Sequence, residues 1–152
     1  MTTAATRFGA AYALLTGAHH VGDYLVQRDT DAKAKGKCGR EGAAACARHV
    51  ASYTATQGLA LYAADRYLRL GLNWKRAAAG LAVSALTHYA IDRCAGHWPE
   101  DDDQAPLLVR AAHATGKGDW LKGAPDAPAL IDQALHKGFL VLAAAVTAGP
   151  AR

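Results

Sequence analysis

Apolar residues in this chain recur at steps of three and four, which is the period of an α-helix. In the first segment the steps run through one face, made of Phe8, Tyr12, Leu15, His19, Asp23 and Val26. About a quarter of the residues are alanine, which has the highest helix propensity of all residues. The sequence has no run that alternates with a period of two, as strands do. The pattern predicts an all-α fold.

Turn-forming and capping residues divide the pattern into four main helices. A polar stretch at 28–40 interrupts the first, and Gly71 is a suitable residue to end the second. Asn73 can cap a third helix, which Gly96 and Pro99 would stop. Asp126 can open the last helix. The expected helices run through Val26 and over 41–70, 73–95 and 126–148.

Four helices of this length predict a four-helix-type bundle formed by one domain over 1–152. An irregular insert at 98–124 is expected before the last helix, with a short helix near 106–114 and a turn at 116–120. Trp98 and Trp120 flank this insert. They either pin it to the bundle or stack on a nucleobase, and pinning is the favoured interpretation.

The composition of the chain indicates where in the cell we expect the protein to be found. Hydrophobic residues make up 51% and charged residues 20% of the chain, as in ordinary globular proteins. The net charge of +4 permits anionic partners without requiring them. Cys38, Cys46 and Cys94 form no CxxC pair, which favours reduced thiols. With no signal peptide or spanning segment predicted, we expect a cytoplasmic protein that could still touch a membrane surface.

Histidine and aspartate occur four residues apart on three of the expected helices. Residues at this spacing lie one turn apart and point the same way. Each pair also interrupts an apolar stripe, so the pairs should be buried. Chance predicts about one such pair in this composition. The observed pairs are His19/Asp23, His88/Asp92, Asp132/His136 and His97/Asp101, of which the last lies beyond a helix end and is set aside.

A buried carboxylate needs an ion partner, hydrogen bonds or a metal. Together with His49, which lies in an Ala- and Cys-rich tract, the three pairs could supply mixed nitrogen and oxygen ligands to two divalent ions such as Zn, Mn, Mg or Fe. The alternative is three structural ion pairs and a satisfied core histidine. The expected metal ligands are His19, Asp23, His49, His88, Asp92, Asp132 and His136.

Further side chains fit around such a centre. Gln27 and Gln133 could orient a water or a carboxylate, and we group them with Asp92 as catalytic candidates. Lys35 and Arg28 could meet the negative charge of a substrate, or be solvated loop charges. His20 faces away from His19 on the helix and is expected to be structural.

The ordered motifs resemble domain-of-unknown-function family 3307, which occurs in bacteria and phages. The resemblance is carried by His19-x3-Asp23 followed by an aromatic residue and Gln27, then Asp29, Ala32 and Lys35, His49, His88-x3-Asp92 and Asp132-Gln133-x2-His136. It spans nearly the whole chain. The resemblance implies a helical protein whose His and Asp residues look like those of metal-dependent hydrolases, and relatives are often predicted to associate with membranes.

These patterns favour a metal-dependent hydrolase with two metal ions that acts on a phosphorylated substrate such as a nucleotide or nucleic acid. The alternative is a non-catalytic binding or regulatory module with a structural His/Asp core. A di-iron redox protein is disfavoured because Glu41 and Glu100 are the only glutamates and neither begins a Glu-x-x-His motif. The oligomeric state is left open.

Overall fold

The computed structural model describes residues 2–150, and within that range it contains helices and no strands. The all-α prediction is therefore confirmed. The elements in chain order are α1 (Ala4–Val21), η1 (Gly22–Val26), α2 (Asp29–Ala34), α3 (Gly39–Leu68), α4 (Trp74–Asp92), α5 (Leu107–Ala112), η2 (His113–Lys117), α6 (Gly118–Gly123) and α7 (Ala127–Ala148), where η marks a π-helical segment.

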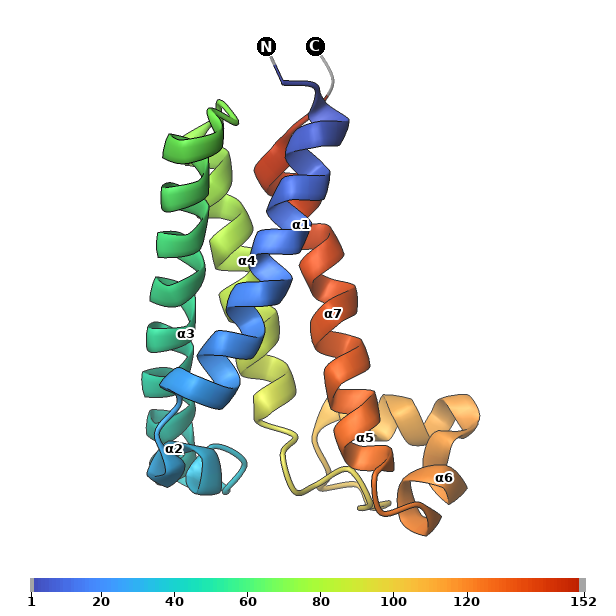
Figure 1. The fold of residues 1–152 in the computed structure, drawn as a ribbon. Coiled ribbons are helices and arrows are strands. Elements are labelled where there is room, and N and C mark those ends of the chain that lie inside the picture. Colours follow the sequence, from blue (N-terminus) through green and yellow to red (C-terminus); the bar gives the residue numbers. More distant parts are fainter. Residues whose placement is uncertain (1, 151–152) are drawn as a thin grey trace.

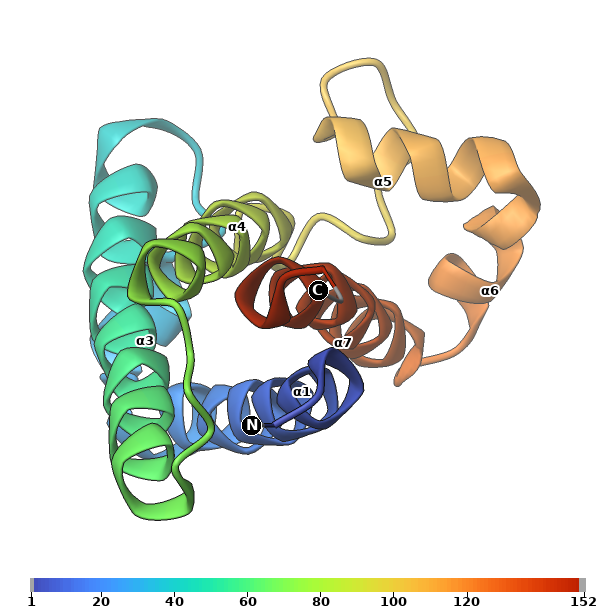
Figure 2. The ribbon, with the colours of Figure 1, turned by 90° about the horizontal axis from the view of Figure 1, so that it is seen from above.

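Four long helices form the bundle that the sequence predicts. Each of α1, α3, α4 and α7 packs against two of the others, so that they surround one core (Figures 1 and 2). Successive long helices run in opposite directions, as the colour order in Figure 1 shows. The short elements α5 and α6 lie outside the four-helix arrangement (Figure 2), beside the lower end of α7 (Figure 1).

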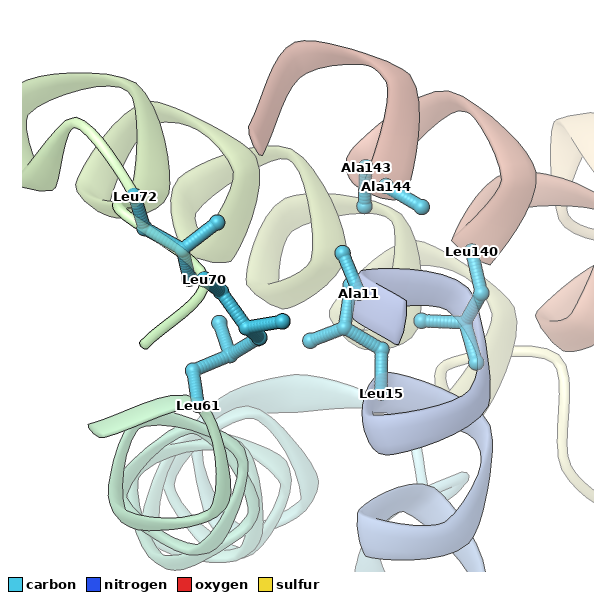
Figure 3. Packing of buried hydrophobic residues seen from close by; sticks show 8 residues of the cluster. All are labelled: Ala11, Leu15, Leu61, Leu70, Leu72, Leu140, Ala143 and Ala144. Carbon is cyan, nitrogen blue, oxygen red and sulfur yellow. The ribbon is translucent and has the colours of Figure 1, made fainter. Parts of the chain in front are cut away.

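The upper end of the bundle in Figure 1 has an apolar core. Leucine and alanine side chains from α1, α3 and α7 meet there with the segment that links α3 to α4 (Figure 3). Alanines at the contact let the helices approach closely, and the leucines fill the remaining volume. We call this set the apolar end; its buried members are Ala11, Leu15, Leu61, Leu70, Leu72, Leu140, Ala143 and Ala144.

The link between α3 and α4 follows the predicted capping with one change. The Asn73 side chain accepts hydrogen bonds from the backbone N–H groups of Lys75 and Arg76, which confirms it as the N-cap of α4. The helix before it ends at Leu68 rather than Leu70, because Arg69 already adopts the left-handed conformation with φ 52°. Gly71, with φ 68°, completes the turn instead of starting it.

The structure departs from prediction after the first helix. The α-helical pattern was expected through Val26, but α1 ends at Val21 and the wider π-helical turn η1 follows. The extra residue in this turn rotates the chain, so that Val26 is 41% exposed instead of buried. The polar stretch at 28–40 does interrupt the helical pattern, yet it contains the short helix α2, whose buried Asp31 is held by Arg48 at 2.6 Å.

The insert between α4 and α7 is more helical than expected. The predicted short helix is present as α5, but the predicted turn at 116–120 is replaced by the end of η2, where Gly116 is left-handed, and the start of α6. The pinning interpretation holds for Trp98, which is buried in a second apolar cluster with Leu121 and Val109. Trp120 is 39% exposed.

One helix in the described range is long and apolar enough to cross a membrane. It is α7, with a mean hydropathy of 1.4 over its most apolar window, of which 22% is buried. The sequence analysis predicted no spanning segment, whereas α7 satisfies the length and composition that a spanning helix requires. A single helix of this kind is weak evidence for a membrane span, so this finding does not place the chain in a membrane.

Candidate metal centre

The lower half of the bundle brings all seven predicted ligands into one cluster. The three i, i+4 pairs come from α1 with η1, from α4 and from α7, and His49 comes from α3. Three groups within this cluster have donor atoms close enough to share an ion, and these groups overlap. Buried His/Asp groups that could hold a metal are thus a property of the fold.

The first of these groups contains Asp23, His49 and His88, and we call it the inner triad. The Nε2 atoms of the two histidines are 3.0 Å apart. Asp23 Oδ1 lies 3.4 Å from Nε2 of His49 and 3.5 Å from Nε2 of His88. The three side chains are at most 8% exposed. Three donor atoms from three elements therefore face a common point inside the bundle.

The second group contains Asp92, Asp132 and His136, and we call it the outer triad. Nε2 of His136 lies 3.5 Å from Asp92 Oδ1 and 3.4 Å from Asp132 Oδ2. The Asp132 side chain is 22% exposed, which makes it the most accessible of the seven. The outer triad is therefore the part of the cluster that solvent reaches.

Asp92 connects the two triads. Its Oδ2 atom lies 3.3 Å from Nε2 of both His49 and His88, while Oδ1 faces His136. A carboxylate whose two oxygens face two donor groups can bridge two ions. The third group, His19 with His88 and His136, shares one histidine with each triad.

Several of these contacts are better explained by a cation than by hydrogen bonds. Their lengths of 3.3 to 3.5 Å exceed the usual range for a good hydrogen bond. They match the roughly 3.0–3.5 Å that separates neighbouring ligands on an ion with bonds of about 2.0–2.2 Å. Asp23 Oδ1, Asp92 Oδ2 and His136 Nε2 are buried and have no hydrogen-bond partner among residues 2–150. The donor set therefore fits a divalent ion of the zinc or manganese type.

His19 also makes a contact that a cation explains better than a hydrogen bond does. Its Nε2 atom lies 3.3 Å from the Gln133 side-chain oxygen, which can only accept, so the ring donates from this nitrogen. The lone pair on Nδ1 then points toward Asp23 Oδ2 at 3.5 Å, and two acceptors face one another. A cation between them would remove this repulsion.

The electrostatics of the protein without metal show two kinds of histidine. Burial lowers the pKa of His19 to about 4. Burial also opposes protonation of His136, but the Asp132 and Asp92 carboxylates outweigh it and raise its pKa to about 9. For Asp92, burial would raise the pKa, yet its contacts with His136, His49 and His88 hold it well below the usual range. The Asp92 carboxylate is therefore charged and draws positive charge into the cluster.

A hydrogen-bonded network supports the inner triad and was not predicted. The Tyr53 ring stacks on the His88 ring with centroids 3.8 Å apart. Gln57 donates to the Tyr53 hydroxyl at 2.8 Å, and Ser84 donates to the Gln57 side-chain oxygen at 2.8 Å, which leaves Tyr53 to donate to Ser84 at 3.0 Å. The signal was present in the sequence, because His49, Tyr53 and Gln57 follow i, i+4 spacing, as do Ser84, His88 and Asp92.

The remaining candidate residues differ in whether they contact the His/Asp cluster. Gln133 and Lys35 contact the cluster, Gln133 through His19 and Lys35 through an ion pair of 3.0 Å with Asp92 Oδ1. Arg28 does not: its side chain is 70% exposed and pairs with Asp31. Gln27 follows η1, and its buried side-chain nitrogen has no hydrogen-bond partner within the described chain.

His20 behaves as the sequence predicts for a residue outside the site. It is half-buried, and Nδ1 bonds the Thr16 carbonyl one turn earlier at 3.0 Å. The cysteines Cys38, Cys46 and Cys94 are free thiols, as expected. Burial raises the pKa of Cys46 to about 12, so this thiol is not a candidate ligand in its ordinary state.

No protein-family model, no curated protein and no solved structure matches the chain. The geometry of the cluster is therefore the basis for assigning a function.

Proposed function

We propose that this protein is a metal-dependent hydrolase, with two metal ions, that acts on a phosphorylated substrate. The observation that carries the proposal is the pair of donor triads connected by Asp92, one of them buried and the other open to solvent at Asp132. The order of the His and Asp motifs supports a place for the chain in family 3307 as part of the same proposal.

Hydrolysis adds water across a phosphorus–oxygen bond: the water oxygen joins phosphorus, and the leaving oxygen takes up a proton. Divalent ions, when bound, polarise the phosphoryl oxygens and make water more acidic. The chain itself contributes three things. Lys35 offsets negative charge beside Asp92, Gln133 fixes the His19 ring, and Tyr53 with its network holds His88.

The test is metal analysis of the purified protein, followed by assays of phosphate monoesters, diesters and nucleotides with Zn, Mn, Mg and Fe. We expect bound metal and metal-dependent turnover of at least one of these classes. His88→Ala removes a ligand of the inner triad and should lose both, whereas His20→Ala should keep both, because His20 bonds only its own helix. Full metal content without turnover of any phosphorylated compound would contradict the proposed hydrolase activity, although the metal site itself would stand.

A second candidate is a binding or regulatory module in which the ion only stabilises the bundle. The burial of the inner triad favours it, since closed sites are typical of structural metals. In that case removal of the ion by a chelator would lower the melting temperature, and no phosphorylated compound would be turned over.

A further inference from the structure

The two triads differ in the charge that the protein places beside them. Lys35 Nζ lies 3.0 Å from Asp92 Oδ1, the oxygen that faces His136 in the outer triad. In the inner triad, Asp23 makes ion pairs with histidines alone among the described residues. An ammonium group thus already stands at the outer triad, next to the oxygen that a second ion would use.

The charges around the cluster do not balance when two ions are bound. Histidines that ligate an ion are neutral, so in this state Asp23, Asp92 and Asp132 carry three negative charges, and Lys35 with the two ions carries five positive charges. Two divalent ions therefore leave an excess of two positive charges. Because Asp92 is 1% and Lys35 15% exposed, solvent screens such an excess poorly.

The backbone of Lys35 is held by packing and a hydrogen bond, whereas its ammonium group is held by the ion pair with Asp92. Arg93 donates a hydrogen bond to the Lys35 carbonyl, and the next residue, Gly36, lies so close to Ala95 that a Cβ there would be 1.9 Å from the Ala95 carbonyl oxygen. The lysine side chain is long and flexible, so it can leave Asp92 without any movement of the helices.

We propose, as a deepening of the proposed function, that Lys35 stands in for a second metal ion in the resting protein. The outer triad then takes up its ion together with a dianionic phosphate, which restores the charge balance. A phosphate monoester carries about −1.5 to −2 at pH 7, whereas a diester carries a single charge and leaves the cluster positive. The substrate class is therefore phosphate monoesters and not the diester backbone of nucleic acids.

The experiment is a titration of the metal-free protein with Mn²⁺ at pH 8, read by calorimetry and by the magnetic coupling of two neighbouring Mn²⁺ ions in electron paramagnetic resonance. It is run alone, with inorganic phosphate and with dimethyl phosphate. In the wild type we expect one tight ion, and a second whose affinity phosphate raises by at least about tenfold. Dimethyl phosphate, a monoanion, should have little effect.

Three variants separate the parts of the proposal. Lys35→Met should bind the second ion without phosphate, and Lys35→Arg, which keeps the charge, should behave as the wild type does. Asp132→Asn should lose the second ion and keep the first. Two equally tight ions in the wild type without phosphate, equal effects of the two phosphates, or binding of no ion would each overturn the proposal.

The phosphate comparison uses the wild type alone, so it remains decisive if a variant folds poorly. No turnover is measured, which keeps the outcome separate from that of the proposed function. If the ion and phosphate bind together but no substrate is hydrolysed, the role of Lys35 stands and the proposed hydrolase activity is wrong. If substrate is hydrolysed but two ions bind equally tightly without phosphate, the hydrolase activity stands and the role of Lys35 is wrong.

Discussion

The two ends of the bundle are built by the same long helices, yet different forces hold them together. At the apolar end, side chains such as Leu15 and Leu140 are removed from water, which stabilises the fold by about 25 cal/mol per Å² of apolar surface. At the metal centre, carboxylates such as Asp92 are buried just as deeply, and this costs free energy unless a cation is present. The apolar end therefore needs only the chain, whereas the metal centre also needs positive charge.

The largest expected effect comes from Asp92, because it joins the two triads. Asp92→Asn keeps the shape but removes the charge that Lys35 and His136 face. We expect the loss of all bound metal and a fall of about 3–5 kcal/mol in the free energy of unfolding, since buried positive charges lose their partner. Metal analysis and urea denaturation measure the two quantities. Normal metal content in this variant would contradict the bridging role.

The matching change at the apolar end should separate stability from metal binding. Leu15 is fully buried, and Leu15→Ala leaves a cavity that costs about 2–5 kcal/mol. Because no donor atom is altered, the metal content per folded molecule should equal that of the wild type. If this variant lost metal as Asp92→Asn does, the two ends would not be independent.

Two glycines test how tightly each end is packed. A Cβ on Gly80 would lie 2.1 Å from Thr147 Oγ1 and 2.6 Å from the Ala143 carbonyl oxygen, so Gly80→Ala must push α4 away from α7. A Cβ on Gly22 would meet the edge of the Tyr53 ring at 2.9 Å. We expect a loss of about 1–3 kcal/mol for Gly80→Ala and a smaller one for Gly22→Ala, because a ring edge can shift more easily than backbone. Thermal melts of both variants give the order, and a larger loss at Gly22 would contradict it.

The smallest effect is a pH dependence at the lower end of the molecule. The Gly36 carbonyl, followed by Glu100, raises the pKa of His97 against the effect of burial. A raised pKa means that this stabilisation is complete below the unfolded value of about 6.5 and is lost as the pH rises through the higher folded value. We expect about 1 kcal/mol or less, measured by denaturation between pH 5 and 9. His97→Gln should flatten this part of the profile, and an unchanged profile would show that His97 contributes nothing.

Much of the fold could be predicted from local sequence signals. The N-cap at Asn73, the long helices and the all-α class follow from propensity and spacing, which act within a few residues. The departures occur where distant contacts compete with local preference. Asp31 holds α2 in place because Arg48, 17 residues away, pairs with it, and the π-turn η1 begins where Gly22 lies against Tyr53 of α3.

The sequence predicted the pairs of site residues on each single helix better than it predicted the contacts between helices. Spacing alone brought His19 and Asp23 to one face, and likewise each of the other pairs. The network of Tyr53, Gln57 and Ser84 extends the same spacing by one turn, but the hydrogen bonds that join Ser84 to the other two form only across helices. Lys35 and Arg28 look alike in the sequence, and the tertiary structure alone separates them, with one at Asp92 and the other at Asp31.

The sequence by itself determined which side chains share a helix face, because an α-helix has a fixed period and a residue four positions on returns to the same side. Only the tertiary structure decided which faces meet, that His49 lies against His88, and that Asp92 joins an inner and an outer triad. Those contacts join residues that are far apart along the chain. They depend on how four helices pack around one core, and no local pattern specifies that.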